Sequence, residues 1–174
     1  MSFTIEKTIE ILERTPKVLI AMLRDISTDW TSKNEGGETW SVYNVIGHLI
    51  HGEKTDWIPR AEIILSERAD KRFEPFDRFA QMETGEWKSL AQLLEEFATL
   101  RQENLDRLQA MKITEKDFSK TGIHPAFGEV TLSKLLSTWA VHDLNHVTQI
   151  TRVMAKQYEL EVGDWKEYLR ILQP

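Results

Sequence analysis

The chain has 174 residues, of which 41% are hydrophobic and 29% are charged, and its formal net charge is −6. This size and composition are those of one ordinary globular domain, so we expect residues 1–174 to form a single domain with a sizeable core. The acidic balance, without a cluster of Lys and Arg, argues against binding to nucleic acid or to an anionic membrane.

Helical periodicity dominates the chain, and we expect no strand of appreciable length. The first helical segment runs from about Phe3 to Ile26, with a break at Thr15-Pro16, because a threonine followed by proline is typical of a helix start. The second helix begins after Ser41, a good N-cap, and runs to about Arg68. Pro59 should kink this helix without ending it.

The second half of the chain contains two further long helices. A loop over Ala69–Glu86 precedes the third helix, which spans about Trp87–Met111. The fourth helix starts with Thr131 as its N-cap and runs over about Leu132–Tyr158, and a tail over Asp164–Leu172 should add a short helical piece. We therefore expect an all-α fold, a four-helix bundle with a long crossover loop and a short C-terminal helical piece.

The stretch WAVHDLNHVTQI, Trp139–Ile150, places His142 and His146 one helical turn apart. Both side chains project from one face, and that face is the apolar side of the fourth helix, so both should point into the bundle. An inward histidine is costly unless it is hydrogen-bonded or bound to a metal. The spacing alone leaves both interpretations open, core histidines with ordinary partners or two metal ligands.

A third histidine strengthens the metal hypothesis. His48 lies at the edge of the inward arc of the second helix, whereas His51 turns to the opposite side and should be solvated. His124 precedes a proline in a loop, where a structural role is expected. Three imidazoles without Cys or an obvious fourth ligand are typical of an open, catalytic site. Zinc or nickel is the favoured ion, and iron, cobalt, copper and manganese would also accept imidazole.

Four other polar residues are candidates for the pocket around such a site: Glu53, Asp56, Asp143 and Gln149. The three acids fall within the inward arcs of their helices. They would orient the imidazoles, serve as a fourth ligand or accept a proton. The alternative for each acid is a boundary salt bridge. The residues alone assign no catalytic group.

Four motifs then form a recognisable series: Trp40-Ser41, GHL at Gly47–Leu49, HPAFGEVTL at His124–Leu132, and VHDLNHVTQI at Val141–Ile150. In order and placement this series resembles the DinB-like (YfiT-like) family of bacterial damage-inducible proteins, over nearly the whole chain. The resemblance implies a four-helix bundle, a homodimer, and a divalent metal held by three histidines. By position these ligands map to His48, His142 and His146.

Characterised relatives in that family include S-transferases and isomerases that use bacillithiol or mycothiol. The resemblance therefore implies an S-transferase in which the metal activates a small-molecule thiol, such as bacillithiol, for attack on an electrophilic substrate. The absence of cysteine suits a thiol supplied from outside. Two alternatives stay open: a metal-dependent hydrolase, and a non-catalytic metal-binding stress-response protein that dimerises through Val141 and Leu144, which point away from the core.

The location of the protein is inferred from what the sequence lacks. Its first residues do not show a basic start followed by an apolar run, as a signal peptide would. The longest apolar stretch, Val18–Leu23, is too short to cross a bilayer. We therefore expect a cytoplasmic protein without a membrane partner.

Overall fold

Helices dominate the computed structural model, which describes residues 2–80 and 88–173. The α-helices are α1 (Ile5–Leu12), α2 (Arg14–Leu23), α3 (Thr28–Ser32), α4 (Val42–Thr55), α5 (Trp57–Leu65), α6 (Leu90–Ala110) and α7 (Leu132–Lys156). The other elements are strands β1 (Thr121–His124) and β2 (Gly128–Thr131) and the 3-10 helices η2 (Glu115–Asp117), η3 (Gly163–Tyr168) and η4 (Arg170–Leu172).

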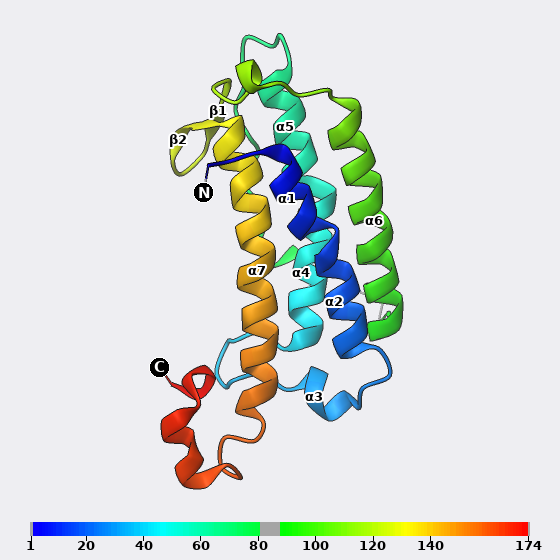
Figure 1. The fold of residues 1–174 in the computed structure, drawn as a ribbon, viewed down its shortest axis with the longest axis vertical. Helices are drawn as coiled ribbons and strands as arrows, with labels where there is room; N and C mark the ends of the chain where they lie inside the picture. The colour runs from blue at the N-terminus through cyan, green and yellow to red at the C-terminus, as the bar shows by residue number, and fades with distance from the viewer. Residues whose placement is uncertain (1, 81–87, 174) are drawn as a thin grey trace.

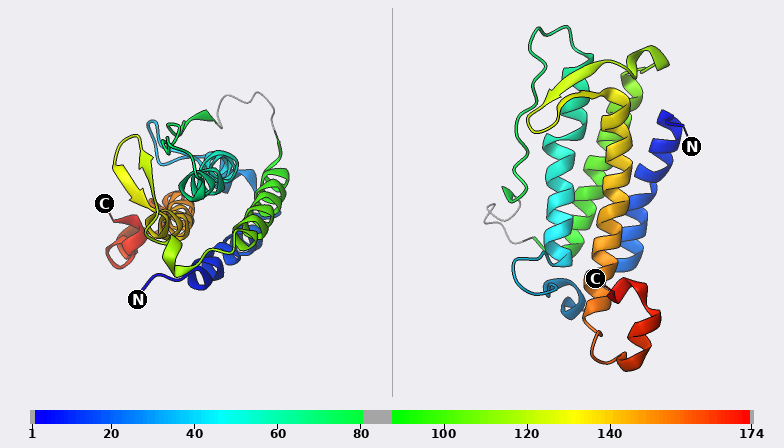
Figure 2. Two further views of the ribbon diagram at one scale, coloured as in Figure 1. Left: turned by 90° about the horizontal axis from the view of Figure 1, so that it is seen from above. Right: turned by 90° about the vertical axis from the view of Figure 1, so that its left-hand side faces the viewer.

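The long helices form four rods: α1 with α2, α4 with α5, α6, and α7 (Figure 1). The α4–α5 rod packs against α6 and α7, and the α1–α2 rod packs against the same two helices from the other side. The chain runs one way along α1–α2 and α7 and the opposite way along α4–α5 and α6 (Figure 2). Because α5 and α6 run in the same direction, their connection must return along the bundle. The predicted all-α four-helix bundle with a long crossover loop is confirmed.

The α1–α2 rod and the α4–α5 rod are each interrupted three residues before a proline. The predicted break at Thr15-Pro16 lies at Glu13, and the predicted kink at Pro59 is a break at Asp56. The ring of a proline clashes with the carbonyl four residues earlier, so the chain leaves the helical path between the two. Each proline is then the third residue of the next helix, where its missing N–H has no helical partner to lose.

A short antiparallel hairpin of Thr121–His124 and Gly128–Thr131 was not among the predicted elements. Each strand has only four residues, too few to establish an alternating pattern in the sequence. The hairpin also holds the start of the crossover loop, since Ile123 accepts a hydrogen bond from the Phe73 N–H and donates one to the Lys71 carbonyl, both at 2.9 Å. The loop that follows brings Phe76 against the ring of His48.

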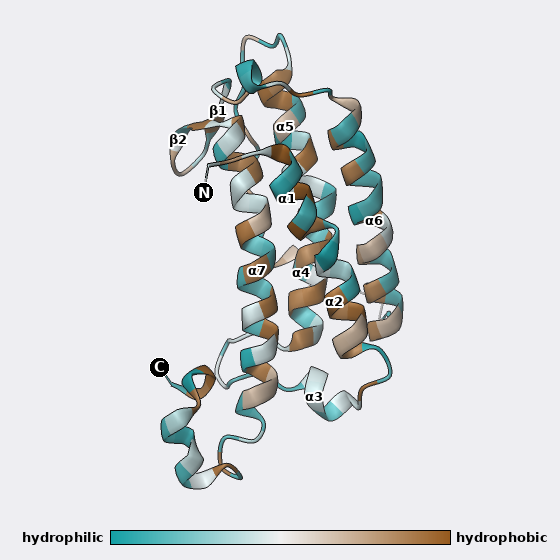
Figure 3. Cartoon of the chain, viewed as in Figure 1, coloured by the Kyte–Doolittle hydropathy of each residue, from teal (hydrophilic) through white to brown (hydrophobic). Residues whose placement is uncertain are grey.

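The buried apolar side chains form two clusters along the bundle. Figure 3 shows hydrophobic and hydrophilic residues alternating along each long helix. One cluster includes Ile46, Leu94 and Ile150, and the other includes Trp57, Leu105 and Trp139. On α4, α6 and α7, buried polar residues lie between the members of the two clusters. None of the helices described is both long and apolar enough to span a membrane.

Arg101 of α6 is the centre of that polar layer. Its guanidinium donates to both carboxylate oxygens of Asp143 at 2.6 and 3.0 Å, and to Glu53 Oε1 at 2.8 Å. Asn104 and Trp139 also donate to Glu53, at 3.0 and 3.1 Å. Glu53 and Asp143, two of the predicted pocket acids, therefore lie in buried ion pairs with Arg101.

The same guanidinium reaches the fourth rod through a carbonyl that Pro16 leaves without a helical partner. In a continuous helix the N–H of residue 16 would bind the Leu12 oxygen, and proline has no N–H. Arg101 Nη1 donates to this oxygen at 2.9 Å. A buried carbonyl without a partner is costly. Arg101 therefore supplies the hydrogen bond that Pro16 cannot donate. Arg101 of α6 thus binds each of the other three rods.

Replacing Arg101 tests this role in the bundle. Arg101→Met leaves Glu53 and Asp143 buried without their cation, so the free energy of unfolding of the metal-free protein should fall by about 3–5 kcal/mol in urea. The control is Arg107→Met on the same helix, where a half-exposed pair with Glu62 should contribute less than about 1 kcal/mol. Equal losses in the two variants contradict the assignment. If Arg101→Met does not fold, adding Glu53→Gln and Asp143→Asn should restore folding.

Candidate metal centre

Two capped helices carry the three predicted ligands. Ser41 and Asn44 form a capping box at the start of α4, which holds His48, and Thr131 caps α7, which holds His142 and His146. Capping satisfies the first free N–H groups and fixes where each helix begins, and with it the face on which each histidine lies. Both caps were predicted from the sequence, and both are confirmed.

The structure brings the three imidazoles together at their Nε2 atoms. His48 Nε2 lies 3.2 Å from His142 Nε2, which lies 3.1 Å from His146 Nε2. Two nitrogens bound to one zinc ion in a tetrahedral arrangement are about 3.3 Å apart, given Zn–N bonds of about 2.0–2.1 Å. The spacing therefore fits a single divalent ion. Among the described residues, no further His, Asp or Glu joins this group.

Hydrogen bonds among the three imidazoles satisfy this triad poorly. The Nδ1–H of His146 donates to Gln149 Oε1 at 2.8 Å, so in the neutral ring its Nε2 is a lone pair. If His142 Nε2–H donates to that lone pair, His142 Nε2 cannot accept a hydrogen bond from His48, and His48 can only share the same proton. If it does not, two lone pairs face each other at 3.1 Å. A cation at this point would receive all three lone pairs, so the donor set fits a metal ion.

Burial disfavours protonation of all three rings. Loss of solvation, followed by the nearby charge of His146, lowers the pKa of His48 and of His142 to about 3. Burial also lowers the pKa of His146, against the opposing effects of the Gln149 hydrogen bond and the Asp143 charge. Neutral imidazole is the form that binds metals, so above pH 5 the site needs to lose no proton from His48 or His142.

The remaining predicted pocket residues divide into one that touches the triad and three that bind arginines. Gln149 orients His146 directly. Glu53 and Asp143 bind Arg101, as described above, and Asp56 pairs with Arg60 at 2.5 Å. Burial raises the pKa of Asp56 to about 6, against the effect of Arg60. All three acids therefore form salt bridges, the second of the two roles that the sequence allowed.

Asp143 still acts on the triad through its charge, because it directly follows His142. Two carboxylates and one guanidinium give the buried layer a formal charge of −1. A net negative charge beside three neutral ligands favours a bound cation over an empty site. Aromatic rings complete the surroundings: Trp40 and Phe76 pack on His48, and Trp57 packs on His142.

The other two histidines lie outside the triad. His51 is partly exposed and contacts the ring of Phe76, so its predicted solvation holds only in part. His124 Nδ1 accepts a hydrogen bond from the Ala126 N–H at 3.1 Å, within the hairpin turn. This is the structural role expected for His124.

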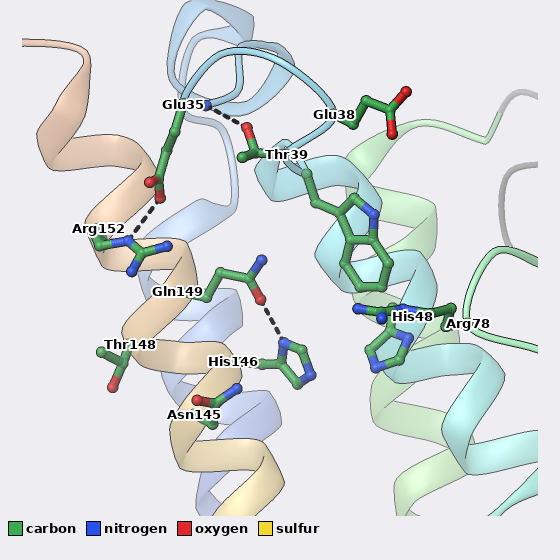
Figure 4. Close-up of a pocket in the computed structure, with 11 residues that line it drawn as sticks. Glu35, Glu38, Thr39, His48, Arg78, Asn145, His146, Thr148, Gln149 and Arg152 are labelled. Carbon is green, nitrogen blue, oxygen red and sulfur yellow. Dashed lines mark hydrogen bonds and ion pairs between the residues drawn. The ribbon is translucent and has the colours of Figure 1, made fainter. Parts of the chain in front are cut away.

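A cleft of about 520 Å³ opens onto the triad, and His48 and His146 form part of its wall (Figure 4). Trp40, Arg78 and Arg152 also line it, and sequence reasoning missed all three as pocket residues. Arg152 follows Gln149 by three residues on α7, so helical spacing contained a signal for it. Nothing comparable pointed to Arg78, which the crossover loop delivers. An open cleft at a site with three ligands leaves room for a substrate.

The depressed histidine pKa values predict how the metal-free protein responds to acid. Below pH 6.5 the unfolded chain binds protons at His48 and His142 that the folded protein does not bind. The free energy of unfolding should therefore fall as the pH falls from 6.5 toward 4, by about 1.4 kcal/mol per pH unit for each histidine. Urea denaturation across this range measures the slope. His142→Gln should lower this slope by about 1.4 kcal/mol per pH unit, the contribution of one histidine. An unchanged slope contradicts the buried neutral state of His142.

Comparison with known proteins agrees with this fold. Residues 11–150 match the DinB superfamily. No curated protein matches the chain. Among solved structures, the chain is similar to YfiT from Bacillus subtilis, with a TM-score of 0.74 and 20% identity over 89% of this chain and 90% of that one. YfiT is described as a probable metal-dependent hydrolase with an unusual four-helix bundle topology. The chain therefore belongs to the DinB superfamily, as its motifs indicated.

Proposed function

We propose that this protein is a metal-dependent S-transferase that joins a small-molecule thiol, such as bacillithiol, to an electrophilic carbon. The observation that carries the proposal is the convergence of three histidine Nε2 atoms beside an open cleft. Zinc or nickel is the favoured ion. When bound, the ion would supply the Lewis acidity that lowers the pKa of a thiol toward neutrality. The sulfur would then attack carbon, a leaving group would depart, and the thiol proton would pass to solvent.

The positions of the acids favour a thiol over water as the nucleophile. Hydrolytic sites with the H-E-x-x-H motif use the acid after the first histidine as a general base. This chain has His142-Asp143-x-x-His146, but Asp143 binds Arg101 through both of its oxygens. Glu35 on the cleft wall is likewise paired with Arg152. A thiol ionises more readily than water and needs no such base.

A metal-dependent hydrolase is the second candidate, because the similar structure of YfiT is described in those words. At 20% identity that likeness supports the fold, and the activity is carried over here only as a proposal. The cleft would then admit an ester or amide, and the polar side chains of its wall would position the attacking water. The third candidate is a metal-binding protein without catalytic activity, and an experiment must distinguish it from the two enzymes.

One assay distinguishes these functions. The metal-loaded protein should conjugate bacillithiol to monochlorobimane. Removing a residue that only hydrogen-bonds a metal ligand typically lowers activity by about 10–100-fold. His142→Ala and His146→Ala, which remove a ligand itself, should lower the conjugation rate by more than that. His51→Ala is the matched control, since His51 lies on α4 outside the triad. Thiol consumption that survives metal removal contradicts the S-transferase. Release of nitrophenol from p-nitrophenyl acetate without thiol supports the hydrolase, and a large fall in Tm on chelation without any turnover supports a structural metal.

We also propose that the protein forms a homodimer through the outer face of α7. Val141 and Leu144 are 63% and 49% exposed on that face, although both are apolar. A second copy would cover them in a symmetric contact. Light scattering should give twice the chain mass, and Leu144→Glu should shift it toward the monomer, whereas Thr99→Glu on the exposed side of α6 should not. A monomeric mass for the unmodified protein at all concentrations contradicts the dimer.

A further inference from the structure

The cleft beside the triad is built with a guanidinium on each of two walls. Arg152 lies on α7, six residues beyond His146, or about 9 Å along the helix axis. Arg78 comes from the crossover loop on the other side, with its guanidinium over the rings of Trp40 and Phe79 at 5.8 and 5.5 Å. Figure 4 shows Arg78 beside His48 and Arg152 above Gln149. Both cations therefore face the space that a substrate would occupy.

Arg152 is held in place by Glu35, whose own loop is fixed by internal hydrogen bonds. Its Nε donates to Glu35 Oε1 at 2.8 Å, and no other hydrogen bond joins Arg152 to the described residues. The Glu35 N–H donates to Thr39 Oγ1 at 3.0 Å, and the Asn34 amide donates to the Thr39 carbonyl at 2.9 Å, so the loop that presents Glu35 is tied to itself. Glu35 thus uses one edge of the guanidinium and leaves the Nη groups for another acceptor.

The two acids of the cleft leave the Nη groups of Arg152 accessible. Glu35 is engaged by Arg152, and Glu38 points away from the histidines at the outer rim (Figure 4). Gln149, which lies between Arg152 and His146 (Figure 4), is neutral, and so is Asn145 on the other side of His146. A guanidinium edge matches the two oxygens of a carboxylate, and such charge-assisted pairs are the stronger hydrogen bonds in proteins.

We infer that the substrate of this cleft is a small molecule whose carboxylate lies several bonds from its reacting atom, with Arg152 and Arg78 binding the carboxylate while the reacting atom meets the triad. This inference rests on the proposed function for the identity of the reacting atom. A volume of about 520 Å³ suits a small molecule. The two arginines are the specificity residues of this proposal.

Matched probes test the inference on the cobalt-loaded protein. 6-Mercaptohexanoate and 6-mercaptohexanol share a chain of about the right reach and differ in the carboxylate, and sulfur binding is read from the thiolate-to-cobalt absorbance. The acid should bind about tenfold or more tightly than the alcohol, as expected for a charge-assisted pair. Arg152→Gln and Arg78→Gln should each reduce this preference. Arg24→Gln, which removes a similarly exposed arginine paired with Glu95 at the end of α2, should not.

A second arm uses adipate and 1,6-hexanediol, which carry no thiol, in calorimetric titrations of the same proteins. Adipate should bind with a dependence on Arg152, and the diol should not bind. Equal affinities for mercaptohexanoate and mercaptohexanol, or an equal effect of Arg24→Gln and Arg152→Gln, overturn the inference. If neither thiol gives the absorbance band, the proposed thiol chemistry fails. Adipate binding that depends on Arg152 then still supports the anion site, and its absence refutes it.

Discussion

The rest of the structure depends on one buried guanidinium. Arg101 is 1% exposed, and it joins the carbonyl that Pro16 leaves without a helical partner to the carboxylates of Glu53 and Asp143. Burying these charges is favourable only while each has its partners, because a single unpaired member would be costly. The network therefore allows few alternative packings of the four rods. It fixes the axial positions of α4 and α7, the two helices that carry the histidines.

The metal centre benefits from this layer in two ways. Asp143 directly follows His142, so the pairing with Arg101 sets the height and rotation of α7 at the triad. The surplus negative charge of the layer also favours a cation at three neutral imidazoles. The same pairing removes Asp143 from the reaction, since both of its oxygens are occupied. One residue thus helps to build the site and, by its orientation, narrows the chemistry that the site can support.

Local signals in the sequence predicted the features that local physics determines. The i, i+4 spacing on an apolar face predicted the inward pair, and the caps at Ser41 and Thr131 predicted where α4 and α7 begin. The role of the inward acids was not predictable in the same way, because it depends on Arg101 from another helix. Even so, Arg101 follows Phe97 by four residues within the apolar stripe of α6, and that position was a usable signal.

Other features depend on segments too short or too distant to read from the sequence. The hairpin strands have four residues each, and the path of the crossover loop follows from their bonds to Lys71 and Phe73. The placement of Arg78 in the cleft follows in turn from that path. Tertiary contacts between distant segments, and not local propensity, therefore define the substrate side of the site.

The most direct test is X-ray absorption and crystallographic anomalous scattering on the metal-loaded protein. One ion per chain should lie at the triad, bound by His48, His142 and His146 through Nε2 at about 2.0–2.1 Å for zinc, with an exchangeable fourth ligand facing the cleft. An ion closed off by a fourth protein ligand, or bound elsewhere and retained equally by His142→Ala and His146→Ala, would contradict an open three-histidine centre.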